Sequence, residues 1–238
     1  MRPARAEMEG TIAAVGCGGT MWKEIAVNFL NLDSPVMRVV SRVADLIILN
    51  WLFILCSLPI VTAGASLTAL HKVILQMLRG EEGPLIRGFL AAFRDNFRKA
   101  TAMWLLLLAL AAVLVVDLVV GGRILPQPLW MAVLASMVLL AVLGLMVLLY
   151  AFPLQARYEN PVGRTLKNAV LLAILHLPET LLMAAIYLAV PVAVYSFPNT
   201  LPAVALLSLF LGFSGIVYLA DLAVYRVFRK TTSEERQA

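Results

Sequence analysis

Apolar residues in this chain gather in long blocks, and charged residues collect between the blocks. There are six such blocks, at residues 43–58, 65–78, 100–120, 129–152, 169–197 and 201–220. Blocks without a polar face are typical of helices that face lipid, and about 20 residues span a bilayer. Backbone polar groups in hydrocarbon must be satisfied within their own segment, so each block predicts a helix. The pattern therefore predicts an all-α, polytopic integral membrane helical bundle with six membrane segments.

The first two blocks are separated by a break with the sequence Cys-Ser-Leu-Pro-Ile-Val-Thr-Ala-Gly at residues 56–64. Two interpretations remain: a short broken hairpin of two passes, or one long crossing with an interfacial extension. Basic residues flank this stretch on both sides: Lys23, Arg38 and Arg42 before it, and Arg79, Arg87, Arg94, Arg98 and Lys99 after it. The positive-inside rule places both flanks in the cytoplasm, which favours the hairpin.

Six crossings with both termini in the cytoplasm leave Arg123 as the one Lys or Arg on the far side. This agreement with the positive-inside rule supports six crossings over five. The block 169–197 is longer than one crossing needs, and Pro178 divides it. Because proline favours the first turn of a helix, we expect the crossing to be residues 178–197.

Two cytoplasmic helices are expected to lie in the membrane interface, at residues 84–99 and 161–176. In the first, Phe89, Phe93 and Phe97 recur every four residues among arginines. That pattern predicts an aromatic face in the acyl boundary, with arginines near the headgroups. The predicted interfacial docking residues are Arg87, Phe89, Phe93, Arg94, Asn96, Phe97, Arg98 and Asn168.

Composition agrees with lipid as the solvent. Hydrophobic residues make up 62% of the 238 positions and charged residues 14%, and the mean hydropathy is +0.91. The net charge of +5 reflects topology and attraction to anionic lipid headgroups. The lipid bilayer is therefore the expected partner, and no nucleic acid is expected.

Two sets of polar residues in the membrane segments are candidates for function. Asn50, Thr62, Ser66 and Thr68 belong to the broken hairpin. They either form a substrate site at the break or bond neighbouring helices and backbone. Four carboxylates also touch the membrane segments, and a structural role is expected for each: Asp45, Asp117, Glu179 and Asp221. Asp221 is expected to lie at a cytoplasmic end near water and Arg226, and Asp117 to pair with Arg123.

No catalytic constellation stands out, so the chain is not expected to be an enzyme. His71 and His176 are the only histidines and lack Glu or Cys at ligand spacing, so neither a metal site nor a cofactor is expected. Cys17 and Cys56 make no disulfide framework.

We expect residues 1–20 to be a disordered tail or a start-site extension, residues 21–230 to form a single domain, and residues 231–238 to be a short polar tail.

Particular motifs resemble the YesL-like family of small bacterial membrane proteins. They are Asp45-x4-Asn50-Trp51, the break at 56–64 followed by Ala69-Leu70, Gly80-Glu81-Glu82, Phe89-x3-Phe93-x2-Asn96-Phe97, Ala100-Thr101 with Trp104, and Lys167-Asn168-Ala169. The resemblance runs from about Met21 to the sixth segment.

The YesL-like family is a domain of unknown function whose genes often lie near genes for carbohydrate uptake. The resemblance therefore implies a multi-pass protein of the bacterial inner membrane with no established catalytic residues. The expected function is an accessory or regulatory component of carbohydrate uptake, with a sugar ABC permease as its partner. The alternative is a small stand-alone transporter with its site at the 56–66 break.

Overall fold

Helices form almost all of the chain that the computed structural model describes, which is residues 35–81, 83–158 and 160–235. No strand occurs in these residues, so the all-α prediction is confirmed. By its internal contacts the chain divides at residue 46, and the described residues from Leu46 onward form one compact unit. Residues 35–45 are the first turns of α2, and all contacts described below lie within residues 46–238. The expected segment 1–20 lies outside the described residues.

Within the described residues, six helical segments are long and apolar enough to cross a membrane, as predicted. They are Met37–Ser57, Ile60–Arg79, Leu85–Ile124, Gln127–Arg157, Leu177–Ser196 and Leu201–Arg229. Each overlaps one of the six apolar blocks of the sequence. The chain is therefore a multi-pass membrane protein.

The break between the first two crossings is also present. Helix α2 (Pro35–Ser57) ends before Pro59, and the short 3-10 helix η1 (Ile60–Thr62) leads into α3 (Ala63–Arg79). Proline lacks a backbone N–H, so it cannot continue the hydrogen bonds of α2. Gly80 ends α3 with a φ of 73°, a left-handed conformation that glycine adopts without a steric penalty.

The third crossing differs from the prediction. The expected interfacial helix 84–99 and the crossing 100–120 are one continuous helix, α4 (Leu85–Ile124). Its first half buries Phe89, Ala92, Asn96 and Ala100 against the protein. Phe89 therefore fills the core, whereas Phe93 is partly buried and Phe97 is exposed, so only part of the predicted aromatic face packs inside the protein.

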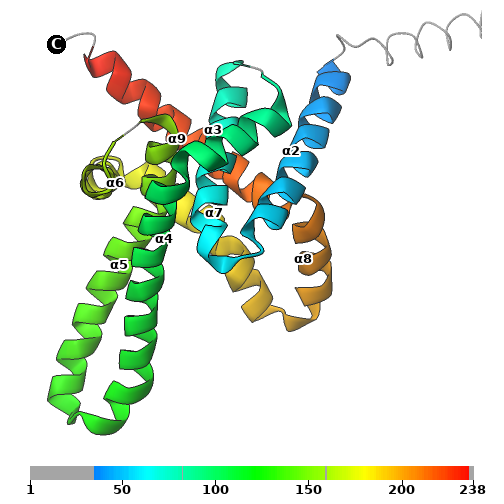
Figure 1. Ribbon diagram of the computed structural model, residues 1–238. Helices are drawn as coiled ribbons and strands as arrows, with labels where there is room; N and C mark the ends of the chain where they lie inside the picture. Colours follow the sequence, from blue (N-terminus) through cyan, green and yellow to red (C-terminus); the bar gives the residue numbers. More distant parts are fainter. Residues whose placement is uncertain (1–34, 82, 159, 236–238) are drawn as a thin grey trace, which may run out of the picture. The chain divides into compact units, whose positions relative to one another are not determined.

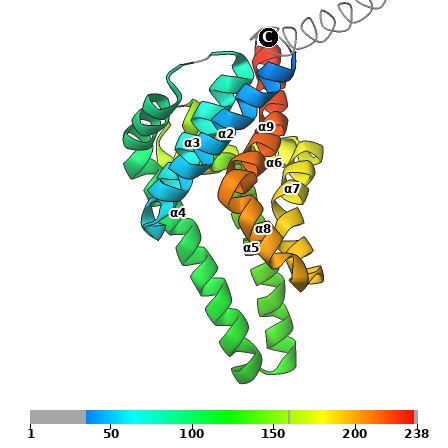
Figure 2. The same ribbon diagram turned by 90° about the vertical axis from the view of Figure 1, so that its right-hand side faces the viewer.

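Helices α4 and α5 (Gln127–Arg157) form a long antiparallel hairpin. Both views show its far half, around residues 105–145, running beyond the other helices (Figures 1 and 2). Large apolar side chains such as Val115, Val116, Leu118, Val138 and Leu139 are more than half exposed there. In a membrane protein such a surface faces lipid.

The fifth block divides as expected. Helix α6 (Val162–Leu175) ends before His176, and α7 (Leu177–Ser196) starts with Pro178 in its first turn. The last crossing consists of α8 (Leu201–Leu207), the π-helix η3 (Ser208–Gly212) and α9 (Phe213–Glu235) in direct succession. Because α9 continues to Glu235, the polar residues 231–235 belong to a helix rather than following it.

Candidate functional site

The polar side chains at the helix break bind the backbone of the break itself. Thr62 Oγ1 donates to the carbonyls of Cys56 and Pro59, at 2.7 Å each. Ser66 Oγ donates to the Thr62 carbonyl at 3.2 Å, and Thr68 Oγ1 to the Gly64 carbonyl at 3.0 Å. Carbonyls at a helix end lack intrahelical partners. Thr62 therefore supplies a hydrogen bond to the Cys56 carbonyl at the end of α2.

Asn50 bonds a distant segment instead. Its Nδ2 donates to the carbonyls of Ser208 and Leu209, at 3.0 and 2.9 Å. Its Oδ1 accepts from the backbone N–H groups of Phe213 and Ser214, both at 3.1 Å. These groups border the π-helix η3, where the regular ladder of helical hydrogen bonds is interrupted. The fully buried Asn50 carboxamide is thus inserted into the ladder of the last crossing and satisfies four of its backbone groups.

The four polar residues of the broken hairpin therefore have separate partners. Asn50 joins α2 to the last crossing, whereas Thr62, Ser66 and Thr68 bond backbone within residues 56–68. Among the described residues, no hydrogen bond joins one of these four side chains to another. Their donors are engaged within the protein rather than directed at a solute.

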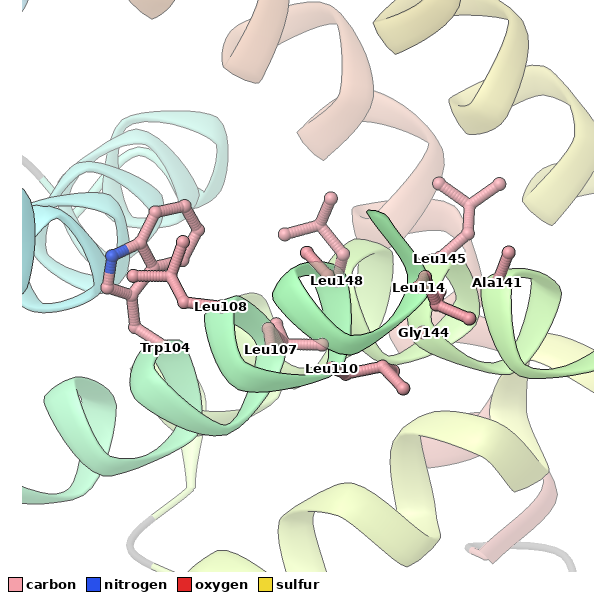
Figure 3. A pocket seen from close by; sticks show the side chains of 10 residues that line it. Trp104, Leu107, Leu108, Leu110, Leu114, Ala141, Gly144, Leu145 and Leu148 are labelled. Atoms are coloured by element: carbon pink, nitrogen blue, oxygen red, sulfur yellow. The ribbon is translucent and has the colours of Figure 1, made fainter. Parts of the chain in front are cut away.

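An apolar groove of about 340 Å³ lies between α4 and α5. Figure 3 shows Trp104, Leu107 and other α4 side chains lining it together with α5 residues such as Gly144 and Leu148. The one polar group of this lining, the Trp104 indole N–H, already donates to the Ile60 carbonyl at 2.8 Å. The groove thus suits acyl chains and offers no hydrogen bond to a sugar.

A buried polar chain connects α4, α5 and α6. Gln155 Nε2 donates to Asn96 Oδ1 at 3.4 Å, and Thr165 Oγ1 donates to Gln155 Oε1 at 3.1 Å. Asn96 also donates to the Ala92 carbonyl. All three side chains are buried, and buried polar groups are costly when a partner is removed. Asn96, predicted as a docking residue, is therefore part of the core.

Replacing Gln155 with leucine should destabilise the protein, because Asn96 Oδ1 loses its donor and Thr165 loses an acceptor. We expect the free energy of unfolding to fall by about 1–3 kcal/mol. Thermal unfolding in detergent measures the change. Ser136→Ala is the matched control, because the exposed Ser136 hydroxyl bonds only the Val133 carbonyl of its own turn. Equal midpoints for Gln155→Leu and the wild type would contradict the assignment.

The predicted docking residues of α4 divide between two faces. Arg94 and Arg98 lie seven and eleven positions after Arg87, so the three arginines form one stripe at about 100° per residue. All three are exposed, whereas Phe89 and Asn96 are buried on the opposite face. Phe93 and Asn168 are partly buried, and Phe97 is exposed. In the described residues no ion pair joins the arginine stripe (Arg87, Arg94, Arg98) to a carboxylate.

The contact between His71 and Asp221 was not predicted. His71 Nδ1 lies 2.7 Å from Asp221 Oδ1, joining α3 to α9. The two side chains are 1% and 0% exposed. The sequence predicted Asp221 at the water boundary near Arg226. In the structure Asp221 is buried and paired with His71 instead. Both residues lie in apolar blocks, and intramembrane ionisable groups need partners. This is the sequence signal from which their pairing could have been inferred.

The other three carboxylates of the membrane segments lie in different surroundings. Glu179 lies in the first turn of α7, where the helix dipole favours an anion. Asp45 lies in α2 and is partly buried. Asp117 is exposed on α4 and forms no ion pair with Arg123, which is six positions further along the helix and on another face. Within the described residues, no group of three or more His, Cys, Asp or Glu side chains is placed to hold a metal ion.

Comparison with known proteins gives one family. Residues 46–118 match the family described as a protein of unknown function, DUF624. No curated protein and no solved structure matches the chain. The matched segment includes Asn50, the break, His71 and the arginine stripe, but not Asp221 or the backbone groups that Asn50 binds. DUF624 is the YesL-like domain, so the segment 46–118 is similar to this family of unknown function, in agreement with the resemblance of the sequence motifs.

Proposed function

We propose that this chain is an accessory or regulatory subunit of a carbohydrate uptake system in the bacterial inner membrane. It acts without catalysing a reaction and binds a sugar ABC permease through the arginine stripe of α4. The stripe is the observation that carries the proposal. The link to carbohydrate follows from the family resemblance.

The stripe is suited to an acidic partner surface. Its three guanidinium groups project from a rigid helix whose opposite face is fixed in the core. Arginine is well suited to interfaces, because its planar group binds carboxylates in two places at once. With α4 oriented as the positive-inside rule predicts, the stripe faces the cytoplasm.

The alternative, a stand-alone transporter with a site at residues 56–66, has less support. The hydroxyls at that break already donate to backbone carbonyls. A sugar site needs free donors and acceptors, because sugars are bound by hydrogen bonds. Flux of a sugar into liposomes that contain the purified chain alone would favour this alternative.

Crosslinking in native membranes tests the subunit proposal. We expect the wild-type chain to crosslink to and co-purify with a sugar ABC permease. The triple variant Arg87→Ala, Arg94→Ala and Arg98→Ala should lose most of this complex, because the acidic partner surface loses its cations. The exposed Arg123, at the opposite end of α4, gives the matched control Arg123→Ala.

Two results would count against the subunit proposal. One is a wild-type chain that remains a solitary monomer under crosslinking. The other is a triple variant that keeps the permease complex but binds vesicles of anionic lipid more weakly. In that case the stripe would bind headgroups rather than a protein.

A further inference from the structure

His71 and Asp221 form a buried acid–base pair that the proposed docking surface does not use. The two residues are 150 positions apart, and their hydrogen bond of 2.7 Å joins α3 to α9. His71 is eight residues before Arg79, the end of its crossing, and Asp221 is eight before Arg229, the end of the last one. Both lie about 12 Å inside those basic ends at 1.5 Å per residue.

One carboxylate oxygen of the pair has no hydrogen-bond partner. Asp221 Oδ2 is buried and has no hydrogen-bond partner. The charge of Asp221 also acts on Tyr187 of α7. In the described residues no charged side chain of α4 or α5 forms an ion pair with either group, and η3 contains no charged residue.

The two protonation states of this pair differ in net charge. A carboxylate beside a neutral imidazole has a net charge of −1, whereas the pair with one added proton has none. A net charge inside the membrane is costly because the surroundings have a low dielectric constant. The bound proton can lie on the imidazole or on the carboxyl, since Nδ1 and Oδ1 are within hydrogen-bond distance.

We propose that His71 and Asp221 form a proton-binding site whose occupancy is coupled to the packing of α3 against α9. The proton comes from water, forms an N–H or O–H bond in the pair, and returns to water on release. Because neither side chain is exposed by more than 1%, water reaches the pair only when the surrounding helices separate. Proton exchange and helix movement are therefore linked. This proposal is independent of the docking surface.

Histidine NMR on the full chain in lipid nanodiscs tests the site directly. The chain has two histidines, so His176→Gln leaves His71 as the only source of imidazole ¹⁵N signals. We expect these signals to change with pH as the pair gains and loses its proton. The amide signals of α3 and α9 should change over the same pH interval.

Two variants show whether the titration belongs to the pair. In the His176→Gln background, Asp221→Asn should shift the His71 transition, because the carboxylate is replaced by a neutral amide. Asp117→Asn should leave the transition unchanged, because Asp117 is an exposed carboxylate on α4.

The proposal is overturned if the His71 signals stay constant over the whole pH range in which the chain is folded. It is also overturned if His71 titrates identically with Asp221→Asn, since the two groups then do not share a proton. The measurement on the intact pair is decisive even if Asp221→Asn does not fold. A transition in His71 without changes in α3 or α9 would overturn the coupling.

Discussion

Replacing Asn50 with leucine is expected to destabilise the last crossing strongly. Four backbone groups of the segment 208–214 lose their partner: two carbonyls and two N–H groups. Leucine has a similar volume but offers neither donor nor acceptor. We expect the free energy of unfolding to fall by about 3 kcal/mol or more, since each unsatisfied buried group costs about 1–3 kcal/mol. Thermal unfolding in detergent or unfolding in lipid measures the loss.

Ser57→Ala is the matched control for Asn50→Leu on the same helix. The buried Ser57 Oγ has no hydrogen-bond partner, so its removal should leave stability unchanged or raise it. The comparison also separates the two interpretations of the helix break. A stable Asn50→Leu variant that fails only in a flux assay would contradict the structural role and favour a transport site.

The crossings could be predicted because their signal is local. Lipid demands about 20 apolar residues in succession, and this demand is visible in any single block. The breaks were visible for the same reason: Pro59 and Pro178 interrupt helices through their own backbone chemistry. The two breaks agree with the structure within a few residues, whereas the third crossing begins 15 residues before its apolar block.

The charge pattern alone does not predict that α4 is continuous. Arg94 and Arg98 precede the apolar block that starts at Ala100, which suggested an interfacial helix ending there. In the structure the arginines occupy one stripe and the apolar residues the opposite face, so the helix continues. The arginines therefore lie along one face of the helix and do not indicate where it ends.

The partners of Asn50 and Asp221 could not be predicted because they are distant in sequence. Asn50 binds groups 158 to 164 positions away, and His71 is 150 positions from Asp221. A single sequence shows that such residues need partners but not which ones satisfy them. Only the packing of α2 and α3 against the last crossing brings these groups together.

Gly64→Ala is expected to destabilise the packing of α3 on α4. A Cβ on Gly64 would lie 2.4 Å from the Trp104 Cβ and 2.7 Å from the Ala100 carbonyl oxygen. Neither neighbour can move easily, since one is backbone and the other belongs to a side chain held by its bond to the Ile60 carbonyl. Glycine is suited to such contacts, because membrane helices gain stability from close approach. We expect the free energy of unfolding to fall by about 1–3 kcal/mol.

Gly88→Ala gives the control for Gly64→Ala, and its effect should have the opposite sign. Gly88 lies inside α4, and a Cβ there would meet no atom within 4 Å. Alanine in a helix interior is favoured over glycine by about 0.5–1 kcal/mol, so this variant should be slightly stabilised. Unfolding midpoints of the two variants in the same lipid measure the difference. If both substitutions stabilise the chain, helix propensity dominates at both positions and the close contact between α3 and α4 does not exist in the membrane.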